Sequence, residues 1–175
     1  MSARDCLGCT SSGATVRLVN PAPSTALFFD DLAIGQRFAS SAREVTHLDI
    51  ERFAALSGDR NPLHTDEDFA RRSIYRGRIA HGMLVQSIAT GLACEMGIFE
   101  GSTLGVLEMQ LRFVSAVKPQ DFVRLELGVV ELDPAPHVRR GFVRLSAQVI
   151  ARQNQVCIDG SWTLLLLRRA GLAKP

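Results

Sequence analysis

The chain has 175 residues, of which 46% are hydrophobic and 22% are charged, and its formal net charge is +2. This length suits one domain with a core that needs no disulfide or metal, and the composition excludes disorder as the working state. The near-neutral charge, without a long run of Lys or Arg, argues against a nucleic-acid-binding surface.

The cysteines and the hydropathy of the chain indicate a compartment. Cys6 and Cys9 form a lone C-x-x-C pair without the second ligand pair of a zinc site, and Cys94 and Cys157 lie in apolar stretches. No segment is long and apolar enough to span a bilayer, and the first residues lack the pattern of a secretory signal. We therefore expect a cytoplasmic protein that does not associate with membranes.

Residues 1–25 are rich in Ser, Thr, Ala, Gly and Pro and are predicted to form a flexible tail before a single domain over residues 26–170. A first strand is expected over residues 38–45. Thr46 then begins a helix as its N-cap, with Asp49 completing a capping box three residues later.

That helix is predicted to end at Ser57-Gly58, because glycine commonly stops a helix. A polar loop over residues 59–68 follows, and then a short helix over residues 69–72. The next segment, residues 82–97, carries no charge before Glu95 and is apolar nearly all round. A helix of this composition is buried on most sides.

After this helix the apolar residues alternate with polar ones, as in half-buried antiparallel strands. The predicted strands cover residues 107–113, 123–127, 143–149 and 156–167. The order of elements predicts an α+β fold, an antiparallel sheet curved around one central apolar helix.

The loop after the first helix places Asp59 and His64 five residues apart, with Pro62 between them. Proline fixes its own φ and restricts the residue before it, so the loop is partly rigid. A carboxylate and an imidazole on a stiff turn can hold one water molecule between them and perform acid–base chemistry near neutral pH.

Other interpretations of this loop remain open from the residues alone. A histidine beside Asp and Asn is often a surface hydrogen-bonding group. A calcium loop lacks its glycine and its closing glutamate, since His64 and Ala70 occupy those places. A metal site built from His64, Asp66 and His81 has a spacing that favours no particular metal.

His81 and Gly82 stand where the apolar helix should begin. The first N–H groups of a helix have no acceptor in their own helix and can bind an anion or a developing oxyanion. Glycine at this place would let a ligand approach the backbone closely, although a glycine near a helix start is also common without a function.

Residues 59–64, Asp-Arg-Asn-Pro-Leu-His, resemble the D-x-N-P-x-H signature of the (R)-specific enoyl-CoA hydratases of the MaoC-like dehydratase family. The segment from Ile79 to Met83 resembles the helix-opening motif of that family, and residues 111–121 resemble its later strand and turn. The likeness covers about residues 28–168. Gln120 departs from it, because family members usually have glycine before the aspartate.

The resemblance implies a hot-dog fold and a homodimer that holds the acyl chain near the subunit interface. Asp59 and His64 would be the catalytic pair, and Asn61 would orient the pair or the loop. The backbone N–H of Gly82 would bind the thioester carbonyl, with His81 beside it in the substrate-binding set. Thr90 is a looser match to a serine near the active site of family members.

The implied activity is the reversible hydration of a trans-2-enoyl-CoA to an (R)-3-hydroxyacyl-CoA, with coenzyme A as part of the substrate and no metal or other cofactor. One alternative is a (3R)-hydroxyacyl-acyl-carrier-protein dehydratase, and a thioesterase would not need Asn61 and Pro62 between its acid and base. A non-catalytic acyl-CoA-binding subunit would not need both Asp59 and His64. A DNA-binding regulator would need a helix-turn-helix that the sequence lacks.

Overall fold

The computed structural model describes residues 26–134 and 137–169, so the predicted tail and the cysteine pair within it lie outside the described residues. The elements in chain order are η1 (Phe29–Asp31), β1 (Arg37–Ala39), β2 (Arg43–Glu44), α1 (His47–Ser57), α2 (Pro62–Thr65), α3 (Glu67–Arg72), α4 (Gly82–Glu95), β3 (Thr103–Phe113), β4 (Phe122–Asp133), β5 (Arg140–Ile150), η2 (Arg152–Asn154) and β6 (Val156–Leu167). None of these helices is long and apolar enough to cross a membrane.

The strands form one antiparallel sheet in the order β1-β4-β5-β6-β3, and β2 also pairs with β4. Along β5 the buried apolar side chains of Val143, Leu145, Ala147 and Val149 alternate with less buried polar ones, as the period-two pattern predicts. β3 lies at an edge of the sheet and differs from β5, because most of its residues are exposed. The α+β prediction is confirmed.

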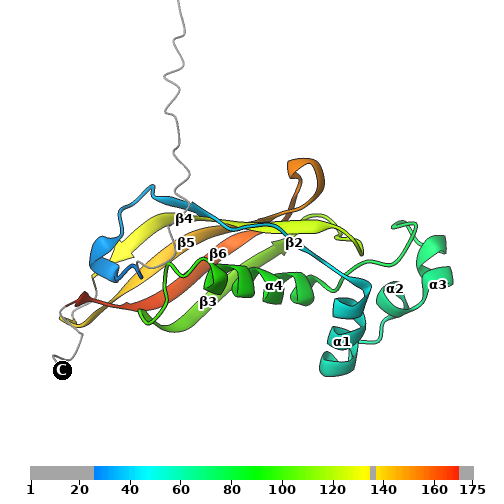
Figure 1. Cartoon of the computed structure of the whole chain (residues 1–175), viewed down its shortest axis with the longest axis horizontal. Coiled ribbons are helices and arrows are strands. Elements are labelled where there is room, and N and C mark those ends of the chain that lie inside the picture. The colour runs from blue at the N-terminus through cyan, green and yellow to red at the C-terminus, as the bar shows by residue number, and fades with distance from the viewer. Residues whose placement is uncertain (1–25, 135–136, 170–175) are drawn as a thin grey trace, which may run out of the picture.

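Helix α4 lies along one face of the sheet, as Figure 1 shows. Its apolar side chains join the core, among them Ile88 and Leu92, which are 4% and 1% exposed. The other side of the helix is open, and Met83, Ser87 and Thr90 are exposed there. The helix is therefore covered on its sheet side and uncovered on the side that faces away from the core.

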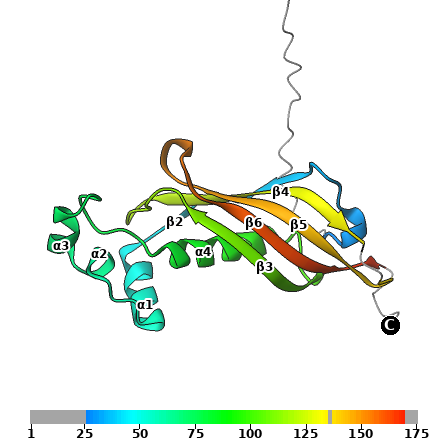
Figure 2. The same ribbon diagram turned by 180° about the vertical axis from the view of Figure 1, so that it is seen from behind.

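Helices α1, α2 and α3 lie beyond one end of the sheet, next to the start of α4 (Figures 1 and 2). The predicted capping box of α1 is present: Asp49 N–H donates to Thr46 Oγ1 at 3.0 Å, and Thr46 N–H donates to Asp49 Oδ2 at 2.9 Å. Gly58 ends the helix with a φ of 78°, in the left-handed region that glycine tolerates best.

Two sequence predictions need correction. The strand expected over residues 38–45 is interrupted, because the Ser40 hydroxyl accepts the Leu125 N–H at 2.9 Å and the ladder with β4 breaks there. The loop expected over residues 59–68 contains helix α2. Asn61 caps that helix by accepting from Leu63 N–H at 3.0 Å, and Pro62 occupies its first position, where proline is favoured.

Gln120, which stands where members of the resembled family usually have glycine, lies in the turn before β4. Gln120 has a φ of 70°, a conformation that costs a non-glycine residue free energy and that glycine adopts readily. Its N–H donates to Val45 O at 2.7 Å, so the turn keeps its place beside the end of β2.

Candidate active site

The turn between α1 and α2 holds its own backbone by short contacts. Asn61 N–H donates to Asp59 Oδ1 at 3.2 Å, and the Asn61 side chain caps α2. The Thr65 hydroxyl lies 3.3 Å from the carbonyl oxygens of Arg60 and Asn61. Asn61 thus fixes the loop that carries Asp59, and its side-chain oxygen is occupied by the helix cap.

The imidazole of His64 is fixed by a backbone carbonyl. Its Nδ1 lies 2.9 Å from the carbonyl oxygen of Ile79, which can only accept a hydrogen bond. Nδ1 therefore carries the proton, and in the neutral ring Nε2 has the lone pair. This tautomer leaves Nε2 as the nitrogen that can exchange a proton with a bound molecule.

His81 is buried, with 2% of its surface exposed, and it contacts the backbone of the loop that carries Asp59. Its Nε2 lies 3.0 Å from the backbone carbonyl of Asp59, so Nε2 carries the proton and Nδ1 has no partner among the described residues. Burial lowers the pKa of His81, and the nearby His64 lowers it further, whereas the contact with the Asp59 carbonyl acts in the opposite direction. His81 is accordingly neutral at pH 7.

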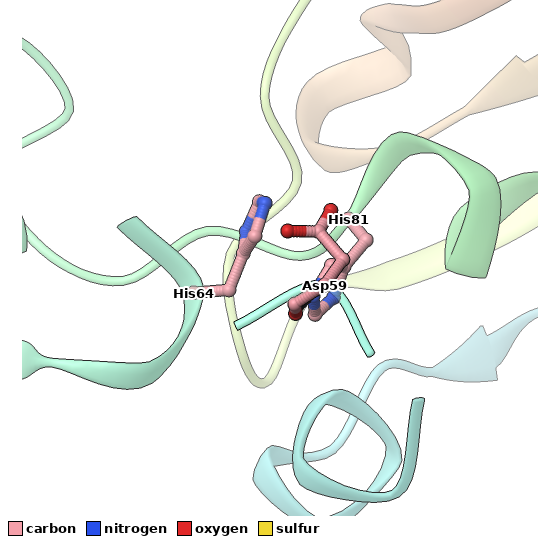
Figure 3. Close-up of side chains that lie close together, drawn as sticks. All are labelled: Asp59, His64 and His81. Atoms are coloured by element: carbon pink, nitrogen blue, oxygen red, sulfur yellow. Dashed lines mark hydrogen bonds between the residues drawn. The ribbon is translucent and has the colours of Figure 1, made fainter. Parts of the chain in front are cut away.

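Asp59, His64 and His81 form one cluster (Figure 3). One ligand atom from each lies within 4.8 Å of the others, and the two imidazole rings stack with centroids 3.8 Å apart. The carboxylate in this cluster is Asp59, whereas the sequence suggested Asp66 for a metal site. Asp66 instead caps α3 by accepting from Phe69 N–H at 2.9 Å.

Gly82 is the first residue of α4, and its N–H has no acceptor among the described residues. The position is also crowded: a Cβ atom added to Gly82 would lie 2.6 Å from the ring of Phe113, so any larger residue requires that ring to move. The start of α4 thereby presents an unpaired N–H next to the positive end of the helix dipole.

These groups line one cavity of about 690 Å³. Its walls contain Asp59, His64, His81 and Gly82, together with residues that the sequence did not single out as site residues. The latter include Phe53, Tyr75, Phe113, Ser115 and Cys157. No local signal marks them, because they come from four separate segments that only the tertiary fold brings together.

Cys157 illustrates why a residue in the wall need not react. Its side chain is 1% exposed, and its Sγ lies 3.2 Å from the carbonyl oxygen of Val149. Burial raises the pKa of this thiol to about 11, so it stays protonated at neutral pH and is a poor nucleophile.

Thr90 is not among the residues that line this cavity. It is exposed on α4, and its hydroxyl donates to the carbonyl oxygen of Ser87 at 2.7 Å within the same helix. It lines a second cavity of about 370 Å³ further along α4. A role for Thr90 in binding stays a prediction.

Comparisons with known proteins identify the family of the chain. Residues 31–149 match the family model described as MaoC like domain, and the chain belongs to this family. An (R)-specific enoyl-CoA hydratase of Rhodospirillum rubrum is 34% identical over 81% of this chain and 93% of its own length. The family is one of hydratases and dehydratases, which supports hydro-lyase activity in general.

Solved structures confirm the fold. A MaoC-like dehydratase from Rhodospirillum rubrum superposes with a TM-score of 0.74 at 26% identity, covering 82% of this chain and 99% of that protein. A Mycobacterium tuberculosis protein with a double hot-dog fold superposes with a TM-score of 0.73 at 22% identity, covering 86% of this chain and 47% of that protein. The predicted hot-dog fold is therefore confirmed.

Proposed function

We propose that this protein reversibly adds water across the 2,3 double bond of a trans-2-enoyl-CoA and forms an (R)-3-hydroxyacyl-CoA. The observation that carries the proposal is the arrangement of one cavity. A carboxylate (Asp59) and an imidazole with a defined tautomer (His64) lie there beside an unpaired helix N–H (Gly82).

Each part of this arrangement meets one demand of the reaction. The thioester carbonyl accepts a hydrogen bond from Gly82 N–H, and the end of the helix dipole stabilises the enolate-like charge of the transition state. Asp59 and His64 Nε2 hold a water molecule against C3. As the bond between its oxygen and C3 forms, one of the pair takes a proton from the water, and a proton is delivered to C2.

The two catalytic groups act as a coupled pair, and the proton balance is the same whichever of them removes the water proton. His81 supports both. Its Nε2–H holds the Asp59 carbonyl, and its neutral ring packs against the ring of His64 without adding a positive charge. The mechanism needs no cofactor besides the coenzyme A portion of the substrate.

The similarity to a protein named (R)-specific enoyl-CoA hydratase supports both the CoA thioester and the R configuration of the product. The test is the decay of the enoyl-thioester absorbance of crotonyl-CoA with the wild-type protein and with Asp59→Asn and His64→Ala. We expect each variant to lower kcat by about 10²–10⁴-fold. Circular dichroism spectra that match the wild type serve as the folding control, and folded variants with wild-type rates would contradict the proposal.

We also propose that two copies of the chain form a homodimer along β3. This edge strand and the residue after it expose large apolar side chains. They are Leu104, Val106, Leu107, Phe113 and Val114. An apolar, unpaired edge strand favours association, and Phe113 also covers Gly82, so the edge continues into the active site.

Light scattering after size exclusion tests the dimer. The wild type is expected to have twice the mass of the chain, and Leu107→Glu to shift toward the monomer because a charge would be buried in the interface. Val138→Glu is the matched control, since Val138 is exposed in the turn between β4 and β5. A wild-type monomer would contradict the proposal.

A further inference from the structure

Gln86 is a buried polar side chain on α4 that the proposed mechanism does not use. It is 3% exposed, and its Oε1 has no hydrogen-bond partner among the described residues. Its Nε2 lies 3.5 Å from Met109 Sδ, which is a weak acceptor. A buried amide is normally well hydrogen-bonded, so the position calls for an explanation.

The location of Gln86 explains why its amide is buried without a good partner. It lies one turn after Gly82, about 6 Å along the helix axis. At the Gly82 end, α4 and β3 both contribute residues to the wall of the catalytic cavity, and Phe113 of β3 lies over Gly82. Further along, the same two elements contribute Thr90 and Met109 to the wall of the second cavity.

The two cavities share no lining residue among those described. Along α4, Gln86 comes after Met83 and Val85, which line the catalytic cavity, and before Thr90, which lines the second cavity. Its contact Met109 also lines the second cavity. An acyl chain bound at the Gly82 N–H and directed along α4 would pass a crotonyl-sized distance before it met this contact. The second cavity, of about 370 Å³, then lies directly beyond.

The second cavity suits an apolar tail. Its walls include Phe99, Val106 and Leu164, and Trp162 faces Met109 across the paired strands β3 and β6. Trp162 is 3% exposed, and its Nε1 has no partner among the described residues. It is also the only tryptophan of the chain, which makes it a specific reporter of this cavity.

We propose that Gln86, in contact with Met109, separates the catalytic cavity from the second cavity and sets the upper limit of the acyl chain. The second cavity is the space that the tail of a longer enoyl thioester enters when the Gln86 side chain is removed. Gln86 is thus a specificity-determining residue. The inference about catalytic preference rests on the proposed hydratase function, whereas the inference about occupancy of the second cavity can be tested without turnover.

The catalytic test compares kcat/KM for crotonyl-CoA and trans-2-octenoyl-CoA. Gln86→Ala is expected to shift the ratio toward octenoyl-CoA by on the order of tenfold to hundredfold, the range that one methylene group contributes in an apolar pocket. Gln86→Met keeps the length of the side chain and is expected to retain the wild-type ratio. Ser87→Ala, on the exposed side of the same turn, is the matched control for an unchanged ratio.

The binding test follows Trp162 fluorescence with the saturated thioesters butyryl-CoA and octanoyl-CoA, which cannot be hydrated, and with free CoA as the baseline. Octanoyl-CoA should change the emission of Gln86→Ala and not that of the wild type or Gln86→Met, and butyryl-CoA should change none of them. An equal response of the wild type and Gln86→Ala to octanoyl-CoA would overturn the inference. This readout stands even if no substrate is hydrated, so failure of the two proposals can be told apart.

Discussion

The two halves of α4 differ in how their polar neighbours are held. At the Gly82 end, backbone carbonyl oxygens fix the imidazoles of His64 and His81 at 2.9 Å and 3.0 Å. Further along the helix, Gln86 and Trp162 keep buried polar atoms without partners among the described residues. Fixed tautomers and short hydrogen bonds are thus concentrated where protons would move, whereas the region further along α4 is mostly apolar and leaves these two buried polar atoms unpaired.

The largest effect is expected when the unpaired N–H of Gly82, at the start of α4, is removed. Gly82→Pro deletes this donor at the first position of α4, where proline is favoured, and His81 before it already has the extended ψ of 135° that proline requires. We expect kcat for crotonyl-CoA to fall by about 10²–10³-fold, the usual loss for one oxyanion donor.

Gly82→Ala is the control for this substitution, because it brings a similar Cβ contact with Phe113 and keeps the N–H. Equal rates of the two variants would show that the N–H does not contribute, and the loss would then come from displacement of the ring.

A substitution in the core of the sheet should lower the stability of the protein without changing its catalytic rate. Leu145 of β5 is fully buried and lines neither cavity. Leu145→Ala is expected to lower the free energy of unfolding by about 2–5 kcal/mol, because it leaves a cavity in the core. Urea unfolding measures this loss, and kcat of the remaining folded protein should stay at the wild-type value. A fall in kcat as large as that of Gly82→Pro would contradict the expectation that Leu145 affects stability and not catalysis.

Because His81 is buried, the stability of the folded protein is expected to fall when acid protonates this side chain. Its pKa in the folded protein lies below the ordinary 6.5, so the unfolded chain binds the proton more readily. The stabilisation that depends on neutral His81 is therefore present above pH 6.5 and is lost as the pH falls below it. Urea unfolding measures the free energy of unfolding at pH values between about 7.5 and 5.5, which bracket the ordinary pKa of histidine. This free energy should decline less for His81→Gln than for the wild type as the pH falls.

His137→Gln, at an exposed histidine in the turn between β4 and β5, is the control and should follow the wild-type decline. If His81→Gln declines as steeply as the wild type, groups other than His81 govern the acid sensitivity.

The smallest expected effect concerns the turn before β4. Gln120 has a φ of 70°, so Gln120→Gly is expected to raise the free energy of unfolding by up to about 1 kcal/mol by relieving this conformation. Gln120→Ala keeps the unfavourable φ and should give no comparable gain. Thermal unfolding of the three proteins checks the order, and a gain for alanine equal to that for glycine would contradict the explanation.

The sequence predicted those features that local chemistry determines. Thr46 and Asp49 mark the start of α1, the uncharged run marks α4, and alternation marks the strands. The sequence also placed Asp59 and His64 in one loop, although it missed the helix within it. The combination of Asn61 and Pro62 would have identified that helix as a capped first turn.

What the sequence could not predict depends on contacts between distant segments. Phe113 lies over Gly82, His81 holds the Asp59 carbonyl, and Met109 meets Gln86 only because the sheet brings β3 against α4. Such contacts leave no local pattern.

The most direct test of the central claim follows crotonyl-CoA by the enoyl-thioester absorbance and by a thiol reagent in the same reaction, with chiral analysis of the product. We expect loss of the enoyl band, formation of (R)-3-hydroxybutyryl-CoA and no release of free CoA. Release of free thiol with the double bond intact would instead show thioester hydrolysis and would contradict the assignment of Asp59 and His64 to the hydration of C3.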